Sequence, residues 1–138
     1  DATMEEIEEA AKASYAHNFI RRLKDGYQTV IAEDGGNLSQ GQKQLLCIAR
    51  VMLCLPPMLI LDEATSNLDA KSEKMVSQAL TNLMKDRTTV MIAHNYSATR
   101  DATHIVVMKD GKVEAEGSPE KMLASNEYYR AFACKSSA

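Results

Sequence analysis

The stretch MLILDEATSNLD, residues 58–69, decides the fold. Its first four residues are all apolar, and a short unbroken apolar run is typical of a strand buried in a parallel sheet. Two acids, Asp62 and Glu63, follow this strand directly. Asp69 closes the stretch and is suited to cap a helix that begins after it. A strand that leads through a polar loop into a helix indicates an α/β protein.

The residues downstream repeat this alternation. Apolar side chains recur at the spacing of one helix face: Val76, Ala79, Leu80 and Leu83. Residues 88–93 and 104–108 predict two more buried strands. Asp110-Gly111 predicts a two-residue hairpin turn into a strand over 112–116. Ser118-Pro119 is typical of a helix start, with a cap followed by proline, and a last helical segment is expected over 127–133.

The residues upstream predict a helical part in front of the sheet. Thr3 and Glu6 form a capping-box pattern for a helix over 3–17, and a second helical segment is expected over 18–23. Residues 27–37 read as extended chain and loop. The next helix has a buried stripe, formed by Leu45, Ile48, Ala49 and Met52. Pro56-Pro57 ends it.

The composition argues against two classes of protein, nucleic-acid binders and membrane-spanning chains. Lys and Arg total 16 against 19 acids, a net charge of −3, which argues against a general nucleic-acid binder. No apolar run approaches the roughly 20 residues of a membrane helix, so we expect no membrane span in this chain.

Two predicted strands end in residues that carry chemistry. Asp62 and Glu63 follow one strand, and His94 follows residues 88–93. Parallel strands present their carboxyl ends at one edge of a sheet, where ligands bind. Two acids and a histidine at that edge suit metal-assisted attack by water. The alternative is that Asp62 caps a turn and that His94 is a structural imidazole.

A polar segment opens the helix that contains Leu45. Ser39, Gln40, Gly41 and Gln42 lie where this helix should begin, and a helix N-terminus offers free amides and a positive dipole end to an anion. Gly41 would let a ligand approach the backbone closely. We interpret the segment as a phosphate-binding helix terminus. The alternative is a helix cap by Ser39 and nothing more.

The order of these features resembles the ATP-binding domain of ABC transporters. Residues 38–42 (LSQGQ) resemble the signature motif, 59–63 (LILDE) the Walker B strand and 66–69 (SNLD) the D-loop, and His94 resembles the switch histidine. The resemblance covers nearly the whole chain and is greatest to the exporter branch. It implies a P-loop NTPase fold of the ABC type, with a helical subdomain over 1–55. The carboxyl-terminal part of the ATPase core would follow over 56–138, as an incomplete, mainly parallel sheet flanked by helices.

The resemblance also implies roles for single residues. Asp62 would hold Mg²⁺ through water, Glu63 would act as the general base, and His94 would contact the γ-phosphate and orient the base. Ser39, Gly41 and Gln42 would bind the γ-phosphate of an ATP held by a second, facing domain. Gln40 replaces the glycine of the commonest signature, a substitution familiar among exporters. Asp69 would join the two sites of this head-to-tail dimer.

The same resemblance implies a partner domain and a location for the protein. The loop around Glu33 would meet the coupling helices of a transmembrane domain, at the cytoplasmic face of a membrane. No G-x-x-x-x-G-K-[ST] loop occurs in the chain, so we expect a carboxyl-terminal fragment that is inactive alone. One alternative is a soluble ABC-type ATPase of DNA maintenance or translation; the DNA-maintenance type would show long coiled-coil heptads before the signature, and residues 1–37 show none. The other alternative is a non-catalytic docking module.

Overall fold

The computed structural model describes residues 1–32, 35–62, 68–96 and 99–135. The chain divides into two compact units, residues 1–91 and residues 92–138. This division by contacts differs from the functional division into 1–55 and 56–138, which stays a prediction.

The first unit begins with short helices. The capping box of α1 (Met4–Ala13) is confirmed, since the Thr3 hydroxyl accepts from the Glu6 amide at 3.2 Å and the Glu6 carboxylate accepts from the Thr3 amide at 2.7 Å. The predicted continuation of α1 to residue 17 is wrong, because Ser14 caps the helix and Tyr15 takes a left-handed φ of 62°. The chain resumes as α2 (His17–Ile20) and a 3-10 turn, η1 (Gly26–Gln28).

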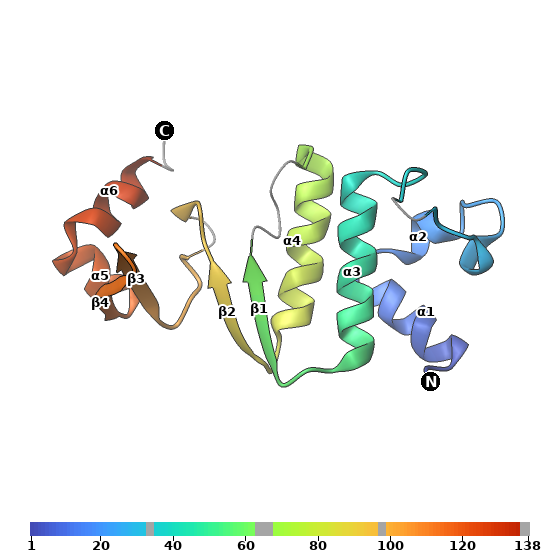
Figure 1. Ribbon diagram of the computed structural model, residues 1–138, viewed down its shortest axis with the longest axis horizontal. Helices are drawn as coiled ribbons and strands as arrows, with labels where there is room; N and C mark the ends of the chain where they lie inside the picture. Colours follow the sequence, from blue (N-terminus) through green and yellow to red (C-terminus); the bar gives the residue numbers. More distant parts are fainter. Residues whose placement is uncertain (33–34, 63–67, 97–98, 136–138) are drawn as a thin grey trace. The chain divides into compact units, whose positions relative to one another are not determined.

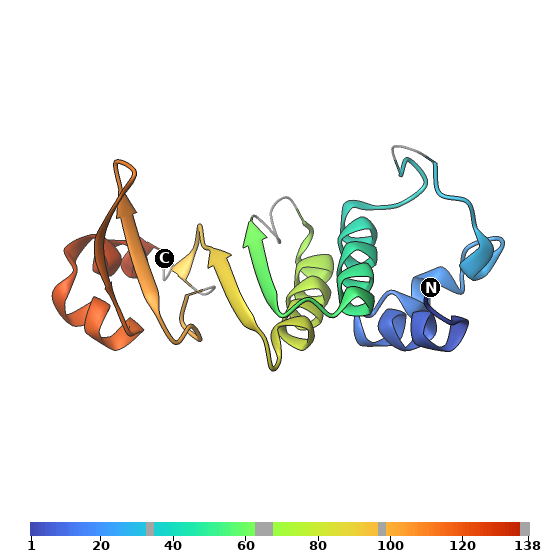
Figure 2. The same ribbon diagram turned by 60° about the horizontal axis from the view of Figure 1, so that its bottom comes forward.

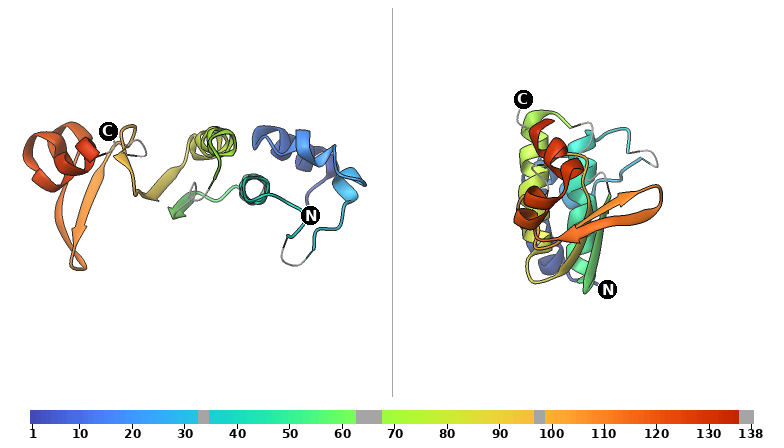
Figure 3. Two further views of the ribbon diagram at one scale, coloured as in Figure 1. Left: turned by 90° about the horizontal axis from the view of Figure 1, so that it is seen from above. Right: turned by 90° about the vertical axis from the view of Figure 1, so that its left-hand side faces the viewer.

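Two long helices cover a small parallel sheet in this unit. They are α3 (Gln40–Cys54) and α4 (Ala70–Met84), which lie side by side and run opposite to β1 (Met58–Asp62) and β2 (Thr88–Ile92) (Figure 1). The two strands pair with each other and point the same way, and α4 connects them (Figure 1). Both helices are seen nearly end-on in one view (Figure 3). The predicted strand–helix–strand alternation is confirmed here.

The core of the first unit lies between its helices and one face of the sheet. The predicted stripe of α4 is buried there in full, together with Leu45 and Ile48 of α3 and Leu59 of β1, whereas Met52 of the α3 stripe is half-buried. The buried members of this cluster are Ala11, Ala16, Ile20, Leu45, Ile48, Leu59, Val76, Ala79, Leu80 and Leu83.

The predicted burial of both strands is wrong. Leu59 is the only fully buried residue of β1, whereas Ile60 is 71% exposed, and on β2 Val90 is 50% exposed. Parallel strands normally have helices on both faces. Among the described residues of this unit, the helices pack on one face only, and the apolar side chains of the other face are therefore exposed.

The second unit is built around an antiparallel hairpin, β3 (Ile105–Lys109) and β4 (Lys112–Gly117), followed by α5 (Pro119–Ser125) and α6 (Glu127–Lys135) (Figure 2). The predicted two-residue turn is confirmed: Asp110 and Gly111 have φ of 49° and 74°, and Lys109 pairs with Lys112. The Ser118 cap and Pro119 start of α5 are confirmed as well.

A separate small core holds the second unit together. Ile105 and Val107 of β3 pack with Met122 and Tyr129. The Tyr129 hydroxyl lies 2.9 Å from the Thr99 hydroxyl, so the buried phenol has a polar partner. Such a partner removes most of the cost of burying the hydroxyl.

Candidate functional site

The start of α3 is a helix terminus capped by Ser39, the alternative that the sequence left open beside a phosphate site. The Ser39 hydroxyl accepts from the Gln42 amide at 3.2 Å, and the Gln42 side-chain oxygen accepts from the Ser39 amide at 2.9 Å. This reciprocal box leaves the first two helical amides, those of Gln40 and Gly41, without a partner inside the helix. The Ser39 hydroxyl hydrogen also stays available to a ligand oxygen. The terminus is therefore equipped to bind an anion at the positive end of the helix dipole.

Gly41 has a packing role that the sequence did not indicate. It is buried, and a Cβ added at this position would lie 2.7 Å from both Cβ and Oγ of Ser72 on α4. Such a contact is far inside the van der Waals limit, so a glycine lets α3 approach α4 closely. The expectation that Gly41 admits a ligand stays a prediction beside this packing role.

Asp62 ends β1 and is exposed, at the carboxyl end of a parallel strand. A single exposed carboxylate fits Mg²⁺, which keeps several of its waters and takes few protein ligands when phosphates complete its shell. Among the described residues, no three His, Cys, Asp or Glu side chains lie close enough to hold a metal ion by themselves. Glu63, the predicted base, lies outside the described residues, as does Glu33 of the predicted coupling loop.

Asp69 caps α4, as the sequence predicts. Its Oδ1 accepts from the amides of Lys71 at 3.1 Å and Ser72 at 3.0 Å. Hydrogen bonds from the side chain and the amide of Ser72 lower the pKa of this exposed carboxyl, and the Lys71 amide adds to the effect. The carboxylate is therefore ionised at neutral pH.

His94 lies two residues beyond the end of β2, is exposed, and belongs to the second unit. Of the predicted site residues, the structure brings Ser39, Gln40, Gly41 and Gln42 together on one helix turn. Asp62 and Asp69 stand at the end of β1 and at the start of α4. Their arrangement with His94 stays a prediction.

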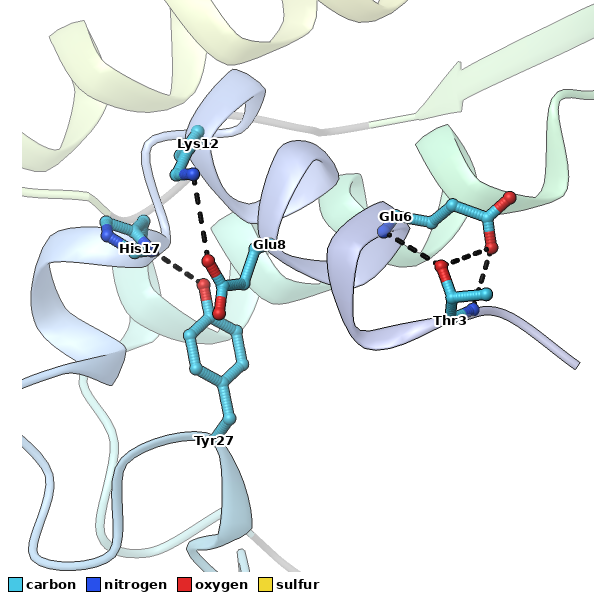
Figure 4. A network of polar contacts seen from close by, with 6 residues as sticks. All are labelled: Thr3, Glu6, Glu8, Lys12, His17 and Tyr27. Atoms are coloured by element: carbon cyan, nitrogen blue, oxygen red, sulfur yellow. Dashed lines mark hydrogen bonds and ion pairs between the residues drawn. The ribbon is translucent and has the colours of Figure 1, made fainter.

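A polar contact that sequence reasoning missed fixes the chain ahead of this site (Figure 4). His17 Nδ1 lies 2.7 Å from the Tyr27 hydroxyl, which ties η1 to α2. Burial, followed by the nearby Glu8 carboxylate, raises the pKa of Tyr27, so the phenol stays protonated. The two residues are ten positions apart across a loop, and no periodic pattern signals such a pair.

Comparison with known proteins agrees with these observations. The ABC transporter family profile matches residues 1–66. The chain is 46% identical over 129 residues to an uncharacterized ABC transporter ATP-binding protein, YfiC, of Bacillus subtilis. The aligned region covers 94% of this chain and 21% of that protein. The chain is 51% identical over 129 residues to the ATP-dependent lipid A-core flippase of Chromobacterium violaceum, covering 94% of this chain and 22% of the flippase.

A solved structure has the same fold. The chain superposes on a bacterial Atm1-family ABC exporter with ATP bound, at a TM-score of 0.85 and 35% identity, over 99% of this chain and 24% of the exporter. The fold and these matches thus identify an ABC-type ATP-binding domain of the α/β class. The chain belongs to the ABC transporter family, with exporter-type homologues. It spans about a fifth of the length of the two curated relatives described above. No helix among its described residues is both long enough and apolar enough to cross a membrane.

Proposed function

We propose that this chain supplies one side of a composite ATP site in a transporter that uses ATP hydrolysis to export a substrate across a membrane. The observation that carries the proposal is the α3 terminus, where the Ser39–Gln42 box leaves two amides and a hydroxyl hydrogen for an anion. The exporter-type relatives support the transport role, and the domain would work at the cytoplasmic face of a membrane.

Ser39, Gly41 and Gln42 bind the γ-phosphate of an ATP that a second, facing ATP-binding domain holds. Gln40 contributes its amide to the same turn. The donors stand at the N-terminus of a 15-residue helix, so the dipole adds to their attraction for the phosphate. Because these donors belong to a different domain from the one that holds the nucleotide, the site is complete only in a head-to-tail dimer. Asp69 links the two sites of that dimer.

Hydrolysis itself is assigned to the strand ends. Asp62 would hold Mg²⁺ through water, and the ion would neutralise charge on the phosphates when bound. Glu63 takes a proton from the attacking water as general base, and His94 contacts the γ-phosphate and orients the base. The loop around Glu33 transmits the cycle to the coupling helices of a transmembrane domain.

The chain alone is inactive in this proposal. Its 138 residues contain no G-x-x-x-x-G-K-[ST] loop, and that loop supplies the lysine and most of the amides that cradle ATP phosphates. Asp62 and Glu63 have no means of holding a nucleotide by themselves. Calorimetric titration of the chain with Mg-ATP is expected to show nothing tighter than about millimolar affinity, roughly −4 kcal/mol.

The deciding experiment uses a full-length transporter that carries this sequence. Glu63→Gln is expected to retain nucleotide binding and to lower the ATPase rate by about 10²–10⁴-fold, because an amide of nearly the same size is no base. Glu5→Gln, on the exposed side of α1, is the control and is expected to leave the rate unchanged. A Glu63→Gln rate within a few-fold of the parent would assign the base to another residue, and micromolar binding by the chain alone would refute its dependence on a second site.

A further inference from the structure

A groove lies in the first unit at the end of α3 that is remote from Ser39. Its volume is about 630 Å³, within the roughly 300–1,000 Å³ of clefts that hold ligands. Its apolar lining comes from α1, α3 and the end of α4: Ala10, Ala13, Met52, Leu53 and Leu83. The Asn82 side-chain amide donates to the Ala13 carbonyl at 3.0 Å, and this bond fixes α4 against the end of α1. The groove is therefore preformed.

Leu55 lines this groove in a conformation that is unfavourable for leucine. It caps α3 with a left-handed backbone, φ 46° and ψ 50°, and its side chain is 68% exposed. Glycine or asparagine normally occupies such a position, because a Cβ is strained there. The chain thus combines backbone strain with an exposed large apolar side chain at one residue. Both costs have a reason if a partner covers Leu55.

The charges around the groove define the partner's chemistry. Asp1, Glu6 and Glu9 place three carboxylates on its lining, against the single guanidinium of Arg87. Hydrogen bonds from Thr3 lower the pKa of Glu6, so that carboxylate is ionised at neutral pH. An acidic rim repels the anionic surface of a membrane, so a lipid headgroup is a poor occupant. A polypeptide with lysine or arginine beside its apolar residues complements the rim.

From these observations we propose that the groove is a docking site for a basic amphipathic helix of another polypeptide. The helix lays leucine-type side chains on Leu55, Met52 and Leu83, and its lysines or arginines face Glu6 and Glu9. This is the helix-in-groove mode of recognition. The surface stands at the opposite end of α3 from the proposed phosphate contacts, roughly 22 Å away for 15 residues at 1.5 Å each. A docked helix therefore leaves the ATP site accessible.

The test is fluorescence anisotropy of the 138-residue chain with labelled synthetic helices of about 14 residues, or four turns. One peptide has leucines on one face and lysines on the other; a second has the same leucines and glutamates in place of the lysines. The lysine peptide is expected to bind, more weakly as salt is raised, and the glutamate peptide is expected not to bind. Equal binding of the two peptides, or no binding of the lysine peptide, would overturn the proposal.

Variants locate the binding on the molecule. Leu55→Asn is expected to weaken binding about tenfold while thermal stability is kept or raised, because asparagine tolerates the left-handed backbone. Glu9→Lys is expected to weaken binding, whereas Glu5→Lys, on the same helix but outside the groove, is its matched control. Ile60→Thr is the control for exposed apolar surface, since Ile60 is 71% exposed on the sheet face. Loss of binding with Ile60→Thr but not with Leu55→Asn would assign the peptide to the sheet and refute the groove.

Discussion

Replacement of Gly41 by alanine tests the close packing of α3 on α4. In an ordinary helix this change raises the free energy of unfolding by about 1 kcal/mol, because alanine is the better helix former. Here the new Cβ would lie 2.7 Å from both Cβ and Oγ of Ser72. Overpacking of this kind costs about 1–3 kcal/mol. The two effects together predict that Gly41→Ala lowers the free energy of unfolding by about 1 kcal/mol.

The assay is urea unfolding of four proteins: the parent chain, Gly41→Ala, Ser72→Gly and the double variant. Ser72→Gly removes Cβ and Oγ and leaves Cα, which is 3.7 Å from the added carbon. The clash is then absent from the double variant, and the cycle should give a favourable coupling of about 1 kcal/mol or more. Cys47→Ala, at an exposed position of α3, is expected to change stability by less than about 0.5 kcal/mol. A Gly41→Ala chain more stable than the parent, or a coupling near zero, would refute the packing argument.

Three further predictions concern the caps and the sheet. Ser39→Ala should lower the free energy of unfolding by about 1 kcal/mol, whereas Ser39→Asp should keep the cap and the stability. Both variants should slow ATP turnover in the full-length transporter. Unchanged turnover in Ser39→Asp would contradict the phosphate contact. The pKa of Asp69 is lower in the folded state than in the unfolded state, so this carboxylate stabilises the fold fully above its unfolded pKa of ~3.9. That stabilisation is lost as the pH falls through the lower folded-state pKa. When unfolding is measured at several pH values, Asp69→Asn should therefore show a smaller loss of stability in acid than the parent chain. The exposed β1–β2 face, with Ile60 and Val90, should drive concentration-dependent association of the isolated chain in light scattering, and a monomer at all concentrations would count against it.

Features that depend on neighbouring residues in the sequence were predicted well. The Thr3–Glu6 box, the Asp69 and Ser118 caps and the Asp110-Gly111 turn all have the expected geometry. Each involves side chains and amides within four positions, so a short stretch contains the whole interaction. The apolar stripe of α4 was predicted for the same reason, since Val76, Ala79, Leu80 and Leu83 share one face by helical periodicity alone.

Features that depend on distant residues were not predictable. The end of α1 at Ala13 has no glycine or proline to announce it; Ser14 is buried there, and its hydroxyl donates to the Ala11 carbonyl at 3.2 Å. The contact between His17 and Tyr27 crosses a loop, and the approach of Gly41 to Ser72 joins two helices. The apolar pattern of residues 58–61 correctly indicated a strand, but it also implied burial on both faces. Burial depends on what covers a face, and among the described residues of the first unit only one face of this sheet is covered.

The two ends of α3 differ in whether the capping residue is one that normally occupies such a position, and this difference bears on function. At Ser39 the cap follows the rules: a serine and a glutamine satisfy each other's amides, and the same residues leave donors for a phosphate. At Leu55 the cap breaks them, since a leucine takes a conformation suited to glycine and exposes its side chain. Stability alone would explain a regular cap, so the phosphate role proposed for Ser39 needs both the donors that this terminus leaves open and the order of motifs around it. The cap at Leu55 is unfavourable for stability, so stability does not explain it. The backbone strain at Leu55 is therefore itself the reason to look for a partner.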